Sequence, residues 1–194
     1  MKAIIFYLSL LTLPLFYSHL NKVTTNPEKS EITSKNEEAE YVVKKLKKDS
    51  NPIDANWDKA QWKGIKAISL DYNMGKQPKF LPKVWAKLMY DEENIYGIFK
   101  VEDRYVRSIV QEYNGNVSGD SCVEFFFSPD SEKPLSYFNL EINAGGTPLI
   151  FYIAKPWDDF TKLGKEDIDQ IEIAHSLPEV VDPEISEPTT WTIE

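Results

Sequence analysis

The feature that most constrains the fold of this sequence is a pair of alternating segments joined by a short polar turn. Residues 84–90 place Val, Ala, Leu and Tyr on one face and Trp, Lys and Met on the other, and residues 95–101 again put apolar residues and a glycine on one face. The residues between them, Asp91-Glu92-Glu93-Asn94, are typical of a turn. A period of two with a short polar connection predicts an antiparallel hairpin.

Further short strand-like segments continue this pattern to the end of the chain, whereas no long amphipathic helix is indicated. They are residues 123–128, 137–143, 149–153, 171–174 and the final segment 190–194. Many short strands separated by turn residues predict an all-β fold, a two-sheet antiparallel β-sandwich of the immunoglobulin or jelly-roll kind. Because the last strand starts without a terminating turn, we expect the sandwich to be incomplete at its C-terminus.

The N-terminal residues have a different composition. Lys2 precedes the apolar run Ala3–Phe16, after which polarity returns. This is the anatomy of a signal peptide, and the run is short for a membrane span. Residues 21–40 are polar and predict a disordered linker. We therefore predict a signal peptide (1–20), a linker (21–40) and a β-sandwich (41–194), with secretion or export to the periplasm; an uncleaved N-terminal anchor is the alternative.

Charge and cysteine content exclude some functions. The net charge is −9 and the isoelectric point is near 4.9, so nucleic acid and anionic lipid surfaces are poor partners, whereas a neutral sugar is unaffected. Cys122 is the only cysteine, which rules out an intrachain disulfide, and its apolar neighbours predict a buried structural thiol.

The segment Asn51–Trp62 lacks the alternation of the strands. It begins with a turn sequence and contains Trp57 and Trp62, five residues apart. We interpret it as an irregular or one-turn helical lid that places both rings on the edge of the core, in structural roles.

Five sequence motifs, in this order, carry a resemblance to a known family. They are Ile53–Trp62, Leu88–Tyr96, Val101–Asp103, Asp120–Asp130 and Tyr137–Asn143, and residues 191–194 resemble the start of a later family strand. From about Tyr41 onward the chain resembles the family 9 carbohydrate-binding modules and their DOMON-like relatives. The resemblance implies a two-sheet sandwich that binds sugars without catalysis, often as an appendage of a glycoside hydrolase.

The sequence departs from the family at the sugar clamp. Characterised sugar binders of the family hold a sugar ring between two Trp side chains, one of which precedes the Asp120 motif. Here Ser118 stands at about that place. The second clamp Trp belongs to a C-terminal part of the family domain that we expect this chain not to reach.

Other residues must then provide a saccharide site, which needs exposed rings beside convergent polar side chains. Trp157 lies in a polar loop, and Trp85 lies on the strand face that carries Lys87. Arg107 follows Asp103 in a loop expected to neighbour residues 116–120. Each has an ordinary alternative: a loop anchor, a sheet cover, or a partner for a carboxylate.

A polar row on one predicted strand completes the candidate set. Asn139, Glu141 and Asn143 alternate with apolar residues, so they share one face. The family resemblance implies that a residue at the place of Glu141 approaches the sugar. An ordinary solvated face is the alternative.

We predict non-catalytic carbohydrate binding by a secreted module associated with polysaccharide breakdown, with a saccharide and possibly a glycoside hydrolase as partners. The alternatives are a ligand-free structural or adaptor sandwich of a larger secreted protein, and a glycoside hydrolase that uses Glu124 and Glu141 as its two carboxylates. No cofactor is expected except calcium, which some relatives bind and for which Asp91 and Asp120 are candidate ligands.

Overall fold

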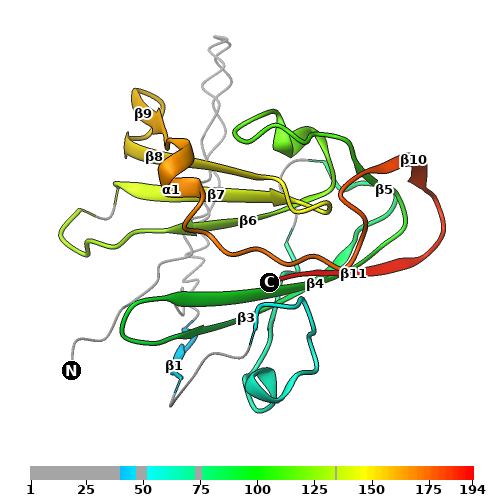
Figure 1. Cartoon of the computed structure of the whole chain (residues 1–194), viewed down its shortest axis with the longest axis horizontal. Coiled ribbons are helices and arrows are strands. Elements are labelled where there is room, and N and C mark those ends of the chain that lie inside the picture. Colours follow the sequence, from blue (N-terminus) through cyan, green and yellow to red (C-terminus); the bar gives the residue numbers. More distant parts are fainter. Residues whose placement is uncertain (1–39, 47–51, 73–75, 134) are drawn as a thin grey trace, which may run out of the picture.

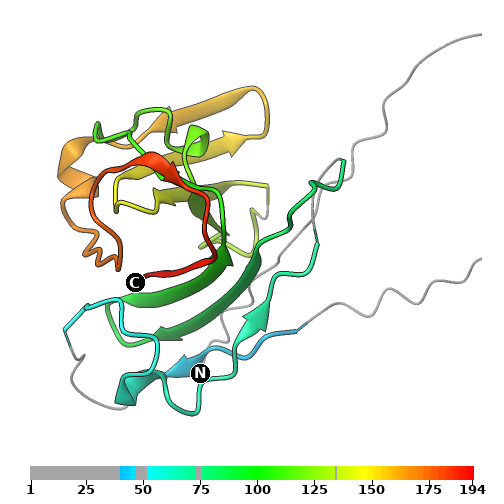
Figure 2. The same cartoon turned by 90° about the vertical axis from the view of Figure 1, so that its right-hand side faces the viewer.

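The computed structural model describes residues 40–46, 52–72, 76–133 and 135–194, which form two layers of mainly antiparallel strands (Figures 1 and 2). One layer, hereafter the β3–β4 sheet, has the order β1-β3-β4-β11, with β2 also paired to β3. Its strands are β1 (Lys44–Lys45), β2 (Ile68–Ser69), β3 (Lys83–Tyr90), β4 (Ile95–Asp103) and β11 (Thr189–Ile193).

The second layer, hereafter the β6–β9 sheet, follows sequence order. Its strands are β6 (Cys122–Phe127), β7 (Tyr137–Asn143), β8 (Pro148–Lys155) and β9 (Asp159–Lys162). A separate pair, β5 (Val106–Ser108) and β10 (Val181–Ile185), connects the layers on one side. The predicted two-sheet β-sandwich is therefore confirmed.

The hairpin predicted from residues 84–101 is present as β3 and β4, in continuous antiparallel register from Lys83↔Glu102 to Tyr90↔Ile95. The Asp91 N–H donates to the Asn94 carbonyl at 3.0 Å and closes the turn. Its carboxylate accepts the backbone N–H groups of Glu93 and Asn94, at 2.8 and 2.7 Å. The turn residues thus set the register of the sheet.

The inner faces of the two sheets meet in a hydrophobic core. A buried cluster includes Val101, Val123, Ile142, Trp191 and Ile193, contributed by β4, β6, β7 and β11. Next to this cluster, side chains of both sheets line a cavity of about 560 Å³. Apolar residues dominate its walls, so it offers few hydrogen bonds to a sugar.

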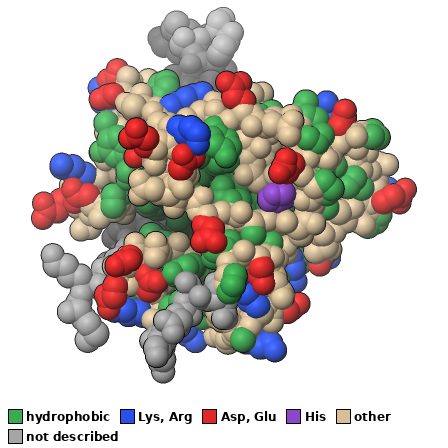
Figure 3. Space-filling model, in the orientation of Figure 1, with side chains coloured by type: hydrophobic (Ala, Val, Ile, Leu, Met, Phe, Trp, Pro, Cys, Tyr) green, Lys and Arg blue, Asp and Glu red, His purple; other side chains and the backbone are tan. Residues whose placement is uncertain are grey.

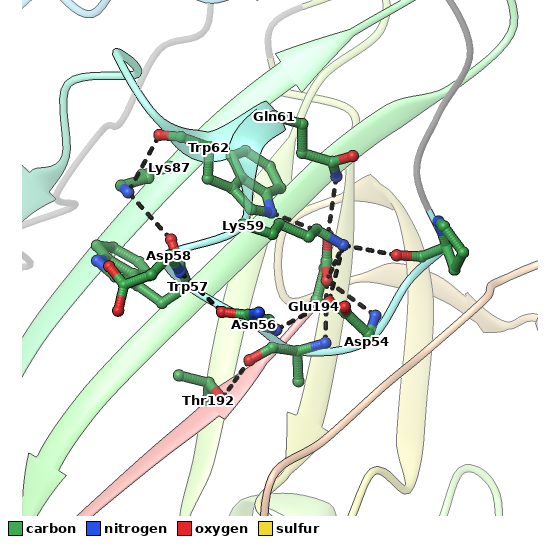
Figure 4. A network of polar contacts seen from close by, with 12 residues as sticks. Asp54, Asn56, Trp57, Asp58, Lys59, Gln61, Trp62, Lys87, Thr192 and Glu194 are labelled. Carbon is green, nitrogen blue, oxygen red and sulfur yellow. Dashed lines mark hydrogen bonds and ion pairs between the residues drawn. The ribbon is translucent and has the colours of Figure 1, made fainter.

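The lid predicted for residues 51–62 covers the outer face of the β3–β4 sheet. Residues 60–62 form a single 3₁₀ turn, and Trp62 is fully buried against Met89 and Ile98. This segment is fastened to β11 through the Glu194 carboxylate, which accepts the N–H groups of Ala55 and of the Trp62 indole at 3.0 and 2.9 Å (Figure 4). The structural interpretation of Trp62 is consistent with this packing.

One predicted strand is not formed. Residues 171–174 lie outside the strands, although Ala174 and Glu194 exchange both backbone hydrogen bonds at 2.9 Å. The pairing continues just beyond this segment, with an isolated bridge between His175 and Ile193 and a hydrogen bond from the Ser176 N–H to the Thr192 carbonyl at 3.0 Å. Residues 171–174 are therefore an extended connection that contacts the end of β11 only through Ala174, and the pairing is too short to form a strand.

Several short elements were not predicted from the sequence. They are β1, β2, β5, β9, β10, the 3₁₀ turn η2 (Val117–Gly119) and the four-residue helix α1 (Lys165–Ile168). Each is shorter than the window over which a periodic pattern is recognisable.

The predicted signal peptide and most of the predicted linker lie outside the described residues. Among the residues that are described, no helix is long and apolar enough to span a membrane.

Candidate carbohydrate-binding site

The outer face of the β6–β9 sheet brings together carboxylates, an amide and aromatic rings. The register sets Glu124 of β6 directly opposite Glu141 of β7, and Phe126 opposite Asn139. On the other side of β7, Asn139 pairs with Phe151 of β8. Strand alternation turns these side chains to one face, because the residues between them point into the core.

Asn139, which is half-buried, and Glu141, which is buried, form the polar centre of this face. The Asn139 amide Nδ2 donates to Glu141 Oε1 at 2.9 Å. Within the described part of the chain, the other acceptor of each side chain, Asn139 Oδ1 and Glu141 Oε2, is shielded and has no hydrogen-bond donor. An unsatisfied buried acceptor costs about 1–3 kcal/mol, so donors supplied by a ligand would be favourable here.

Negative charge is concentrated beside this pair. Partial burial, and secondly the negative charge of Glu141, raise the pKa of the Glu124 carboxyl above its ordinary value. As a whole the Glu124 residue is exposed at the edge strand β6. Carboxylates accept hydrogen bonds only, so this face suits a ligand rich in hydroxyl donors.

Cys122 lies on the same face, two residues before Glu124. Burial is the main cause that raises its pKa to about 12, and the charges of Glu124 and Glu141 contribute. At neutral pH the group is a protonated thiol, and the residue is half-buried rather than fully buried as predicted.

Aromatic rings flank the polar centre on both sides. Phe126 is 42% exposed and its ring centroid lies 5.9 Å from that of Tyr137. On β8 and β9, Phe151 and Phe160 make an edge contact at 5.7 Å, and Phe160 is 61% exposed. These rings offer apolar faces to the C–H side of a sugar. These phenylalanine rings were not predicted as site residues. The alternation that places Asn139 on the outer face also places Phe126 there, so the sequence contained the signal for Phe126.

Asn143 shares the strand face of Asn139 and Glu141 but has a different environment. It is fully buried, and its Nδ2 donates to the Val110 carbonyl and to Asp120 Oδ2, both at 2.9 Å. Its Oδ1 accepts the Thr147 N–H at 2.8 Å. With these three partners Asn143 fastens the loop before β6 to the sheet, and it contributes to the face indirectly.

Trp157 lies at one end of the same sheet, in the turn between β8 and β9. It is 87% exposed, as expected for a ring that a ligand can reach, and its φ of 66° is in the left-handed region. Asn139 pairs with Phe151, whereas Trp157 lies two residues beyond Lys155, the last residue of β8. At about 3.4 Å per strand residue, the turn begins roughly 13 Å from Asn139, so Trp157 does not belong to the polar centre around Asn139 and Glu141.

The two other candidate residues lie elsewhere. Arg107 lies on the strand β5 rather than in the predicted loop, and its backbone bonds to Ser121, directly after the predicted neighbours 116–120. Its side chain lies 3.5 Å from the Asp182 carboxylate. Trp85 is on β3, in the opposite layer. The proposed set is therefore divided among three places, and only Asn139 and Glu141 are in direct contact.

The clamp position does not add an aromatic ring to the site, and the candidate calcium ligands do not come together as a metal site among the described residues. Ser118 is exposed on η2. Asp91 is engaged in the β3–β4 turn, and Asp120 Oδ2 accepts the N–H groups of Ile109 and Val110 at 3.0 and 2.9 Å. No group of three or more His, Cys, Asp or Glu side chains suited to a metal ion occurs among the described residues.

The protein is a two-layer β-sandwich whose outward β6–β9 face carries carboxylates, an amide and aromatic rings, the kinds of side chain that can hold a saccharide. The model of carbohydrate-binding family 9 matches residues 49–194, and the chain belongs to this family. Among solved structures, a candidate carbohydrate-binding protein from Bacteroides uniformis is 25% identical, with a TM-score of 0.67 over 78% of this chain and 68% of that one. No curated protein matches the chain.

Proposed function

We propose that the protein is an exported, non-catalytic module that binds a neutral saccharide on the outer face of the β6–β9 sheet and takes part in polysaccharide breakdown. The observation that carries this proposal is the pair of unpartnered acceptors, Asn139 Oδ1 and Glu141 Oε2, between exposed phenylalanine rings. Sugar hydroxyls supply the missing donors, and the rings cover the C–H face of the sugar.

Family membership supports saccharide binding, and the acidic character of the face favours a neutral ligand over an anionic one. Export is supported by the pattern of Lys2 followed by the apolar run 3–16. The proposed partner is a glycoside hydrolase, either fused to the module or separate, which the module would bring to its polysaccharide.

Calorimetric titration with neutral oligosaccharides of glucose, xylose and mannose tests the proposal. We expect Glu141→Gln and Asn139→Ala each to weaken binding by about tenfold, since a hydrogen bond to a charged or shielded group is worth roughly 1.5 kcal/mol or more. Glu187→Gln is the matched control, because it removes the same charge from an exposed loop position and should leave affinity unchanged.

Two results separate the alternatives. Binding that is unchanged in Glu141→Gln, Asn139→Ala and Trp157→Ala, or no binding to any neutral glycan, favours a ligand-free adaptor. Turnover of an aryl glycoside that disappears in Glu124→Gln indicates a hydrolase, and a non-catalytic module predicts no turnover at all.

A further inference from the structure

The outer face of the β3–β4 sheet carries a second arrangement of chemistry-bearing side chains, distinct from the face described above. Trp85 of β3 lies directly opposite Lys100 of β4, and Trp57 of the covering segment lies over the same place. The Lys100 ammonium is 4.9 Å from the centroid of the Trp85 ring and 5.0 Å from that of Trp57. A cation is thus held between two tryptophan rings that are 28 residues apart in sequence.

Lys100 has no anionic partner in this position. Among the described residues, none accepts a hydrogen bond from its ammonium or forms an ion pair with it. The nearest acidic side chain along β4, Glu102, lies 3.9 Å from Lys83. An ammonium has three donors, and ring faces satisfy them only weakly, so Lys100 retains capacity for an anion.

A second ammonium lies close by and strengthens the positive potential. Lys87 lies 4.1 Å from the centroid of the Trp57 ring and donates to the Trp57 and Trp62 carbonyls at 3.4 and 3.3 Å (Figure 4). Burial lowers its pKa; the charge of Asp58 acts in the opposite direction, and the like charge of Lys100 lowers it further. Two like charges close to one ring favour a bound anion.

The rings are held in place before any ligand arrives. The covering segment is fixed by the Glu194 carboxylate, which accepts the Asp54 and Ala55 N–H groups at 3.1 and 3.0 Å. Trp57 follows two residues later, and Trp85 is part of a strand paired on both sides. A preorganised site loses less conformational entropy on binding.

The charge distribution of the chain agrees with an anionic ligand on this side. In the sequence, residues 40–100 contain 12 Lys or Arg and 8 Asp or Glu, whereas residues 101–194 contain 6 and 19. Figure 3 shows acidic and basic side chains on both layers of the molecule. The protein is acidic as a whole, but the part of the sequence that contains Trp57, Trp85 and Lys100 has an excess of basic residues.

We propose that Trp57, Lys100 and Trp85 form a second saccharide subsite, which binds an anionic sugar residue through its carboxylate or sulfate group. The rings pack on the sugar C–H faces, and Lys100 pairs with the anionic group. Neutral saccharides on the β6–β9 sheet and anionic ones on the β3–β4 sheet would then occupy opposite sides of the same module. This inference rests on saccharide binding as the function but not on the Asn139–Glu141 site.

Calorimetric titration of the full chain at low salt with trigalacturonic acid, its neutral methyl ester and a sulfated galactan oligosaccharide tests the proposal. We expect at least one charged ligand to bind about tenfold or more tightly than the methyl ester, as for a charge-assisted hydrogen bond. The charged ligand that binds more tightly identifies the anionic group as carboxylate or sulfate. Added salt should weaken this binding.

Variants locate the site. Lys100→Met and Trp85→Ala should each weaken binding of the charged ligand about tenfold, whereas Lys100→Arg should retain most of it. Lys133→Met is the matched control, since it removes the same charge from an exposed turn of the other sheet. Indole N–H signals of the five tryptophans report contact directly, and those of Trp57 and Trp85 should shift.

The proposal is overturned if neither charged ligand binds, if the methyl ester binds equally well, or if Lys100→Met matches the unmodified chain while its thermal unfolding is unchanged. Loss of charged-ligand binding in Glu141→Gln would also overturn it, because that residue lies on the other sheet. Failure of neutral saccharides to bind contradicts the first site only, so the two failures are distinguishable.

Discussion

The buried carboxylate of Glu194 offers the sharpest test of how the covering segment is held. Its side chain is 1% exposed and lies 2.6 Å from the ammonium of Lys59, which is 7% exposed. Oε2 also accepts two backbone N–H groups, and Oε1 accepts Gln61 Nε2 and the Trp62 indole at 3.1 and 2.9 Å. One carboxylate therefore joins β11 to five donors of the segment 54–62.

Glu194→Gln keeps the shape of this side chain but replaces one oxygen with an NH₂ group. Either orientation of the amide turns that NH₂ toward at least two donors, and the charge that balances Lys59 is lost. Breaking a buried, hydrogen-bonded ion pair costs about 3–5 kcal/mol. Lys59 retains Asp54 at 3.0 Å and the Pro52 carbonyl at 2.7 Å, so we expect the lower value, about 3 kcal/mol.

Chemical denaturation monitored by tryptophan fluorescence measures this loss of unfolding free energy. The midpoint temperature of thermal unfolding should fall by roughly 3 °C per kcal/mol for a domain of this size. Glu187→Gln, an exposed change of the same charge, should alter stability by less than about 0.5 kcal/mol. In a double-mutant cycle, Lys59→Met combined with Glu194→Gln should cost less than the sum of the single changes. A loss below about 1 kcal/mol in Glu194→Gln, or strict additivity, would refute the reasoning.

Two further predictions concern titration. The Tyr96 hydroxyl, with the backbone N–H groups of Glu93 and Asn94, lowers the pKa of Asp91 to about 2, so Tyr96→Phe should raise that pKa toward its ordinary value of 3.8 when the carboxyl carbon is followed by NMR. Because the folded-state pKa is depressed, the stability contributed by Asp91 is present above about pH 4 and is lost as the pH falls through about 2; an unchanged pKa in the variant would contradict the assignment. Cys122, with its pKa raised to about 12, should resist iodoacetamide at pH 8 in the folded protein and react after unfolding, as measured by mass spectrometry; rapid alkylation of the folded chain would show that the thiol is not shielded.

The candidate site shows how far sequence reasoning reaches. Alternation alone placed Asn139, Glu141 and Asn143 on one face, and that placement is consistent with the register of β7. It gave no means of distinguishing their environments, because the loop before β6 that covers Asn143 comes from more than twenty residues earlier in the chain. Burial by a distant segment is a tertiary event.

Local pattern determined the parts of this protein that depend on neighbouring residues. The β3–β4 hairpin, the turn at Asp91 and the inward and outward faces of β6 and β7 follow from alternation and turn chemistry. The order of family motifs likewise indicated the sandwich.

The tertiary structure alone decided which distant groups meet. Glu194 reaches the segment 54–62 across more than 130 residues, and Lys100 lies between Trp57 and Trp85 only because three separate segments converge on one sheet face. Residues 171–174 have a strand-like sequence, yet only Ala174 among them pairs with the end of β11, and this leaves them outside the sheet. Strand pattern is local, whereas the partner of a charge or a ring depends on the packing of the whole chain, and this is why the contacts of Glu194 and Lys100 emerged only from the structure.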